Sequence, residues 1–238
     1  MLPEQGSKWI QASWVANAEV SMARTAATEA PDARGSARAY RLTGEPIPIF
    51  RRAQPKDCLD LAKATFLNCE RVDMGTLATQ LATSRSTLYR WFGSREELLE
   101  QMLVELAQEF SAAARADAAG EGDERVLDFA RRIMNATADF GPLRAFIAHE
   151  PQLALRLLIG ERGAVHKSIA HAMLEVIAET HSPEEAKTLE HHVDVVVQVA
   201  TALQWATLAI GEEPSTERAV DIVGVMLAAG RAASTSSA

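Results

Sequence analysis

The run VDMGTLATQLATSRSTLYRWFGSR, from Val72 to Arg95, constrains the fold of this chain more than any other segment. Its apolar residues recur at i, i+3 and i+4, first around Leu77 and Leu81 and again around Leu88 and Trp91. This spacing predicts two short helices joined by a turn at residues 82–84. A second helix packed on the first in this way presents its opposite face outward, as helix-turn-helix proteins do toward the major groove of DNA.

The outward face of the second predicted helix carries only side chains that can donate hydrogen bonds. They are Arg85, Ser86, Thr87, Tyr89 and Arg90, and none of them is acidic. Phosphate oxygens and base edges accept hydrogen bonds, so a face of this composition suits a polyanion. The alternative is a plain pair of packed helices in which the tyrosine fills the core.

At these residues the chain resembles the tetracycline-repressor-like (TetR) family of bacterial regulators. The resemblance rests on the pattern S-x-x-T-L-Y-x-x-F, which begins at Ser84, and on the pattern S-[KR]-x-[ED]-L-L, which begins at Ser94. It extends over residues 55–103. Ala82 departs from the glycine that is usual in the family's turn, and Thr83 departs from an apolar residue. Ala82 can replace glycine if the turn avoids a positive φ or accepts modest strain.

The resemblance implies an all-α fold with an N-terminal three-helix DNA-binding domain and a C-terminal helical domain for ligand binding and dimerisation. We therefore predict an extension over residues 1–50, a helix-turn-helix domain over residues 51–100 and an effector-binding and dimerisation domain over residues 101–238. For residues 8–28 of the extension we predict an amphipathic helix, and for the rest of it a linker.

The resemblance also implies further DNA contacts, which add Arg51, Arg52, Thr76 and Arg95 to the outward face. Arg95 would bind phosphate at the start of a long helix, whereas Arg51 and Arg52 are as readily explained as solvated side chains.

Charge is distributed unevenly along the chain. The net charge is −8, yet residues 34–95 carry eleven basic and five acidic side chains. An acidic C-terminal part would steer a DNA duplex toward the basic end, although many acidic helical domains do not bind DNA. No apolar run reaches the ~18 residues of a membrane span, and the N-terminus lacks a signal-peptide pattern, so we expect a cytoplasmic protein.

Two late helices are predicted to form the dimer interface. The segment 189–210 is apolar nearly all round, so it must be covered on more than one side. The final helix carries an apolar stripe with small residues that permit close approach. Two such helices from each chain would make a four-helix interface in a homodimer. The predicted interface residues are Val193, Val196, Leu203, Val220, Val223, Gly224 and Leu227.

The resemblance places an effector pocket inside the C-terminal domain. The side chains expected to reach it are Phe110, Phe129, Ile133, Met134, Phe146, His149, Met173, Ile177, Gln198, Thr201 and Trp205. A bulky apolar lining with few polar groups suits an uncharged or amphiphilic molecule, such as an acyl chain, a lactone or an aromatic compound. Ordinary core packing is the alternative for each residue.

The sequence shows no catalytic or metal-binding pattern. His166 and His171 are five residues apart and His191 directly precedes His192, whereas helical metal pairs favour i, i+4 spacing. Cys58 and Cys69 are expected on one helix, about three turns apart, as reduced core residues.

We therefore predict a ligand-responsive transcriptional regulator without a cofactor. It would act as a repressor that a small hydrophobic or amphiphilic effector releases from a pseudo-palindromic operator. A constitutive DNA-binding regulator without an effector is one alternative. A helical enzyme or carrier of a hydrophobic small molecule is another.

Overall fold

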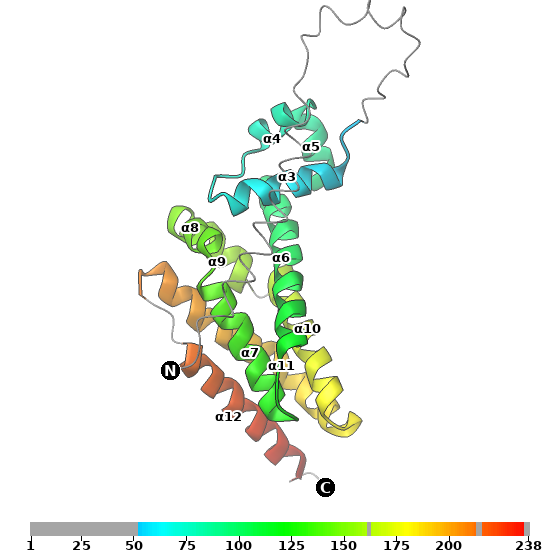
Figure 1. The fold of residues 1–238 in the computed structure, drawn as a ribbon, viewed down its shortest axis with the longest axis vertical. Helices are drawn as coiled ribbons and strands as arrows, with labels where there is room; N and C mark the ends of the chain where they lie inside the picture. Colours follow the sequence, from blue (N-terminus) through cyan, green and yellow to red (C-terminus); the bar gives the residue numbers. More distant parts are fainter. Residues whose placement is uncertain (1–51, 161–162, 213–215, 236–238) are drawn as a thin grey trace, which may run out of the picture. The chain divides into compact units, whose positions relative to one another are not determined.

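The computed structural model describes residues 52–160, 163–212 and 216–235, and helices are the only regular secondary structure in those ranges (Figure 1). The all-α prediction is therefore confirmed. The predicted extension, with its amphipathic helix at residues 8–28, lies outside the described residues, as does Arg51.

The first described helices form a three-helix unit, made of α3 (Pro55–Leu67), α4 (Met74–Gln80) and α5 (Arg85–Phe92). Side chains cap the second and third of these helices. The Asp73 carboxylate accepts hydrogen bonds from the backbone amides of Gly75 and Thr76, and the Ser84 hydroxyl accepts one from the amide of Thr87. These caps satisfy amides that the first turn of a helix leaves unpaired, and they fix where α4 and α5 begin.

Two residues in the turns of this unit have a positive φ without being glycine. Ala82 in the turn between α4 and α5 has φ 47°, so the turn keeps the left-handed backbone that glycine would favour and accepts the strain. Cys69 has φ 60° and is exposed, because α3 ends at Leu67 instead of continuing past it. The prediction that Cys69 is a core residue is wrong. Cys58 is buried as predicted, and desolvation raises the pKa of its thiol to about 11.

The helix α6 (Arg95–Asp117) runs from the three-helix unit into the rest of the chain (Figure 1). Ser94 and Glu97 start it with the predicted capping box, since the Ser94 hydroxyl accepts from the Glu97 amide and donates to the Glu97 carboxylate, both at 3.1 Å. The helix packs against α3 and α5 near its start and against later helices further along. One continuous helix therefore belongs to both packing units.

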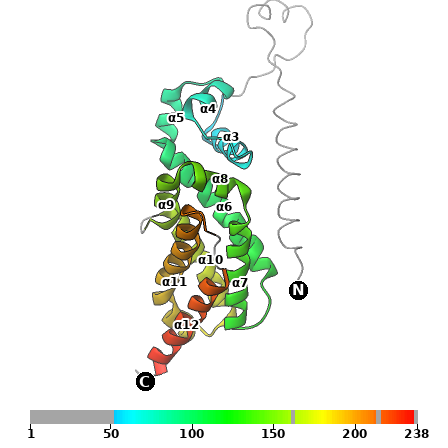
Figure 2. The ribbon, with the colours of Figure 1, turned by 90° about the vertical axis from the view of Figure 1, so that its left-hand side faces the viewer.

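The remaining helices form the body, in which α7 and α10 pack along α6 (Figures 1 and 2). Glycine and proline residues separate the body helices, and they include Pro142 and Pro151. Among them, α11 and α12 pack together, and α12 also packs on α7. The body helices are α7 (Asp123–Ala138), α8 (Gly141–His149), α9 (Pro151–Ile159), α10 (Ala164–Thr180), α11 (Pro183–Ala209) and α12 (Thr216–Thr235).

The structure corrects the predicted dimer residues. Most of them are at most 3% exposed within a single chain, namely Val193, Val196, Val220, Val223 and Leu227. A side chain that is already buried in its own chain has almost no surface left for a partner to cover. Leu203 is half-buried, and a Cβ added to Gly224 would lie 3.6 Å from Leu127 of α7. These residues make the contact between α11, α12 and the body core.

An ion pair joins the start of α6 to the body. The Arg95 guanidinium donates from Nη1 to Glu150 Oε2 at 2.8 Å and from Nη2 to Glu150 Oε1 at 2.6 Å. Its Nε donates to the carbonyl oxygen of Val72 at 2.6 Å, in the segment between α3 and α4. Glu150 stands where α8 ends and α9 begins, because Pro151 cannot continue the first helix. Arg95 therefore connects three separate segments.

This arrangement gives Arg95 a structural contact inside the chain. Its side chain is 19% exposed and that of Glu150 is 21% exposed, and each guanidinium nitrogen of Arg95 makes a hydrogen bond inside the chain. The contact of Arg95 with phosphate stays a prediction, and these hydrogen bonds compete with it. The paired Arg95, together with Arg71 at 3.5 Å, lowers the pKa of the Glu150 carboxyl.

We predict that Glu150→Gln lowers the free energy of unfolding by about 1–3 kcal/mol at pH 7, because Arg95 loses a charged, bidentate acceptor. Folding lowers the pKa of Glu150 from its ordinary value of 4.5, so the stabilisation is complete above that pH and is lost as the pH falls through the lower folded pKa. Urea unfolding of both proteins at pH 7 and at successively lower pH measures the difference.

Asp60→Asn is the matched control. Asp60 pairs with Lys56 at 2.9 Å on α3, but its side chain is 49% exposed, so its loss should cost no more than about 0.5 kcal/mol. An equal effect of the two substitutions, or a Glu150→Gln effect that stays constant with pH, would contradict the account.

Candidate nucleic-acid interface and interior cavities

The outward face of α5 gathers the side chains that the sequence placed there. Arg85, Ser86, Tyr89 and Arg90 are exposed, and Thr87 is half-buried. Tyr89 is 49% exposed, which is unusual for a large hydrophobic ring in this chain. The opposite face holds Leu88 and Phe92, which are buried in the three-helix unit. Burial of one face thus fixes which side of α5 is free for a partner.

Hydroxyl groups at the start of α5 form a small network. Ser84 Oγ lies 2.8 Å from Ser86 Oγ and 2.9 Å from Thr87 Oγ1, and it accepts from the Thr87 amide at 3.1 Å. Each hydroxyl can both donate and accept, so these groups can rotate to meet phosphate or base acceptors. The network orients Ser86 and Thr87 before any ligand arrives.

Gly75 of α4 makes room for Arg85. A Cβ added at Gly75 would lie 2.1 Å from Arg85 Nη2, so the guanidinium rests directly against the glycine backbone. Asp73 lies near by. Hydrogen bonds from the amide of Thr76 and then that of Gly75, with the charge of Arg85 as a smaller cause, lower the pKa of the Asp73 carboxyl. The sequence analysis did not single out Gly75, although a glycine in the first turn of α4 is a signal for close approach.

Two other predicted DNA contacts are also exposed. Arg52 precedes α3 in the sequence, and Thr76 is in the first turn of α4, where its hydroxyl donates to Asp73 at 3.3 Å. Arg85 and Arg90 are the exposed cationic groups of α5, which agrees with the basic composition of residues 34–95.

The interior of the body contains two small apolar cavities. Their volumes are about 40 Å³ and 30 Å³, and both border Ile133, Thr137, Ile169 and Trp205. The Gln204 amide donates to the Met134 carbonyl oxygen at 2.8 Å and to the Thr137 hydroxyl at 3.0 Å, beside the larger one. Of the predicted ligand residues, these cavities bring together Phe110, Ile133, Met134, Met173, Thr201 and Trp205.

The remaining predicted ligand residues lie elsewhere. Phe129 and Ile177 are fully buried and border neither cavity, and the half-buried Gln198 also borders neither.

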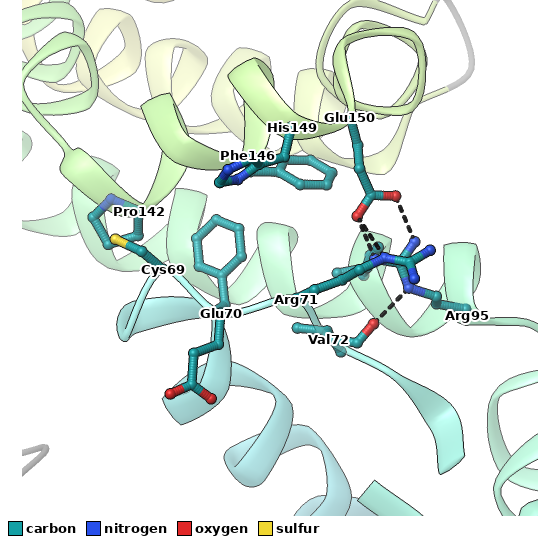
Figure 3. A pocket seen from close by; sticks show the side chains of 11 residues that line it. Cys69, Glu70, Arg71, Val72, Arg95, Pro142, Phe146, His149 and Glu150 are labelled. Carbon is teal, nitrogen blue, oxygen red and sulfur yellow. Dashed lines mark hydrogen bonds and ion pairs between the residues drawn. The ribbon is translucent and has the colours of Figure 1, made fainter. Parts of the chain in front are cut away.

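Phe146 and His149 line a different and larger space, which we call the junction cavity (Figure 3). Its volume is about 400 Å³. The residues that line it are Phe66, Cys69, Glu70, Arg71, Val72, Arg95, Leu99, Pro142, Phe146, His149 and Glu150.

Among the described residues, no helix combines the length and the apolar character that crossing a membrane requires.

Comparison with known proteins relates the chain to one family. The family described as "Tetracyclin repressor-like, C-terminal domain" matches residues 121–228. The solved structure of the transcriptional repressor QsdR of R. erythropolis, from the TetR family, is 28% identical with a TM-score of 0.66. That match covers 73% of this chain and 94% of QsdR.

A second solved structure is that of the TetR family repressor AlkX from Dietzia sp. strain DQ12-45-1b, implicated in biodegradation of n-alkanes. It is 19% identical with a TM-score of 0.55, and the match covers 76% of this chain and 97% of AlkX, so it supports the fold. No curated protein matches the chain. The helix-turn-helix unit, the all-helical body and these matches agree, and together they support a transcriptional regulator that is similar to the tetracycline-repressor-like family.

Proposed function

We propose that this regulator is a repressor that binds a pseudo-palindromic operator as a homodimer and leaves it when a small apolar or amphiphilic molecule enters the body. The observation that carries the proposal is α6, which starts at the three-helix unit and lines an interior cavity through Leu103, Leu106 and Phe110. A displacement inside the body therefore has a rigid path to the DNA-binding face. QsdR is itself a transcriptional repressor.

In the proposed complex, α5 enters the major groove. Arg85, Ser86 and Arg90 would contact base edges, while Thr87 and Tyr89 would contact phosphates, with Arg52 and Thr76 adding contacts to the DNA backbone. Arg85 must leave its place against Gly75 to reach a guanine, and the nearby Asp73 carboxylate opposes that movement by charge attraction. A guanine that accepts two hydrogen bonds compensates for this, so Arg85 would contribute to sequence specificity.

The exposed apolar residues of α11 and α12 supply the proposed dimer surface. Val195 on α11 is 49% exposed, Ile210 directly after α11 is 72% exposed, and Val225 on α12 is 69% exposed. Large apolar side chains at such exposure are few among the described residues, and these three lie on or next to the two helices that pack together. A four-helix interface would cover them and would set the two α5 helices about one DNA turn, ~34–36 Å, apart.

The effector site is proposed around Trp205 and Ile133, which border both interior cavities. Cavities of 40 Å³ and 30 Å³ are far below the ~300 Å³ or more of typical ligand pockets. A ligand can therefore enter only by separating the helices that line the space, α6 among them. Thr137 and Gln204 would hydrogen-bond a polar head group, and the apolar lining would hold the rest.

The nearly filled body also favours a second candidate, a regulator that binds DNA constitutively. In that case Trp205 and its neighbours are only core, and no ligand changes operator affinity. A helical enzyme or carrier remains the alternative from another class, and sequence-specific DNA binding would argue against it. Mobility-shift titration on the DNA upstream of the protein's own gene, with and without long-chain alcohols or lactones, distinguishes the three.

We predict that Arg85→Ala weakens operator binding by about 1–3 kcal/mol more than it weakens binding to random DNA, because a guanine contact exists only on the operator. Tyr89→Ala should weaken both by similar factors, since phosphates are present on every duplex. Fluorescence anisotropy at fixed salt measures all four affinities. If Arg85→Ala lowers the affinity for operator and for random DNA by the same factor, Arg85 makes no base-specific contact.

We predict that Val225→Asp dissociates the dimer, because a carboxylate would be desolvated without a partner at the interface. Ala112→Asp on the exposed side of α6 introduces the same charge away from α11 and α12 and should leave the dimer intact. Sedimentation velocity measures the oligomeric state of each variant. A Val225→Asp protein that stays dimeric would place the interface on another surface.

A further inference from the structure

We propose that the junction cavity is a binding site for a small organic acid that combines a carboxylate with an apolar or aromatic group. The site is distinct from the interior cavities around Trp205, with which it shares no lining residue. Its volume of about 400 Å³ lies within the range of roughly 300–1,000 Å³ that is usual for small-molecule pockets.

One wall of the junction cavity is apolar. Phe66 and Phe146 meet edge to face, with ring centroids 5.8 Å apart and planes at 66°. Leu99 and Pro142 are further apolar residues of the lining, and Val72 lies next to Arg95. Aromatic rings in this arrangement leave faces and edges that accept a flat or aliphatic group, so the wall favours a ligand with an apolar part.

Another side of the cavity brings two arginines to one carboxylate, and the lining as a whole holds two arginines and two glutamates. Arg71 and Arg95 converge on the single carboxylate of Glu150, as Figure 3 shows. Two guanidinium groups bring ten N–H donors, and one carboxylate cannot accept them all. Arg95 is committed to Glu150 and Val72, whereas the Arg71 side chain is 71% exposed and lies at 3.5 Å from Glu150. Arg71 is therefore the group best placed to receive a second carboxylate.

Other ionisable groups of the cavity do not cancel the charge of Arg71. The Glu70 side chain points away from Arg71 and His149 in Figure 3, into solvent. His149 is exposed and adds no carboxylate to the cavity. An anion therefore meets attraction from Arg71 at the polar end, and a cation or a neutral polar molecule finds no comparable partner.

The junction cavity is lined by residues of two parts of the fold, so a bound ligand would affect how these parts are held together. Phe66 and Arg71 belong to the three-helix unit and the segment that follows α3, whereas Pro142 and Phe146 belong to α8 of the body. A ligand that touches both sides stabilises the arrangement in which they lie together. The site would thus act on the same connection that α6 makes, through a ligand of different chemistry from the proposed effector.

Cys69 provides a direct reporter of occupancy. It lines the junction cavity and is exposed, whereas the other cysteine, Cys58, is fully buried with a raised pKa and should not react. The experiment measures the rate at which iodoacetamide alkylates Cys69 in the full chain, by mass spectrometry of the cysteine-containing peptides. The probes are benzoate, phenylacetate and hexanoate at millimolar concentration and constant ionic strength.

The proposal predicts saturable protection of Cys69 by at least one of these acids. The rate should fall about tenfold at roughly nine times the Kd, because only the unoccupied site reacts. The matched amides, benzamide, phenylacetamide and hexanamide, should not protect. Arg71→Gln should abolish the protection, whereas Arg52→Gln, which removes an exposed arginine outside the cavity, should retain it.

Three results would overturn the proposal. Failure of all three acids to protect would exclude organic acids as ligands of this cavity. Equal protection by an acid and its amide, or by the acid in the Arg71→Gln variant, would show that the carboxylate is not recognised. Equal protection by inorganic phosphate would show a simple anion site. The alkylation experiment contains no DNA, so none of these results tests the proposed repressor function.

Discussion

The bidentate pairing of Arg95 with Glu150 fixes the three-helix unit against the body. Arg95 is the first residue of α6 and Glu150 is the break between α8 and α9, so the pair joins two elements whose backbones are already held by helix packing. The third hydrogen bond, from Arg95 to Val72, adds the segment that leads into α4. One guanidinium thus adds to the packing of α6 on α3 and α5 in holding the three-helix unit against the body.

In the proposed mechanism, this connection lets the body act on the DNA-binding face. α6 contributes Leu98 and Leu99 to packing near its start and Phe110 to the wall of an interior cavity further along. A helix transmits a displacement along its length because its backbone hydrogen bonds keep it rigid. The junction cavity lies beside the same ion pair, so two different cavities of this chain border the path between the body and the DNA-binding face.

The sequence alone was sufficient for features that depend on local interactions. The cap at Ser94 and the prolines that break the body helices act within a few residues, and the structure has them as the sequence indicates. The caps at Asp73 and Ser84 are equally local, although they were not predicted. The pairing of Arg95 with Glu150 was not predicted, because the two residues are 55 positions apart and no local pattern records that distance. Cys69 was misplaced because α3 ends in a left-handed turn that a non-glycine residue rarely adopts.

The dimer residues illustrate a different limit. Helix α11 is apolar nearly all round, and periodicity cannot tell which face its own chain covers and which face remains exposed. The structure assigns Val193 and Val196 to the chain's own core and leaves Val195 exposed. The same limit applies to the predicted ligand residues. The sequence could not show that Trp205 lines a small interior cavity whereas Phe146 and His149 line the separate junction cavity.

The role of Arg95 as a positioning residue is tested most directly by a double-mutant cycle on operator affinity. The four proteins are the wild type, Arg95→Gln, Glu150→Gln and the double variant, each titrated with operator DNA at several salt concentrations. If the pair acts by holding the three-helix unit, the double variant should bind no more weakly than the weaker single variant, and the salt dependence should not change. If Arg95→Gln weakens binding as much in the Glu150→Gln background as in the wild type and lowers the salt slope by about one unit, Arg95 contacts phosphate and the account is contradicted.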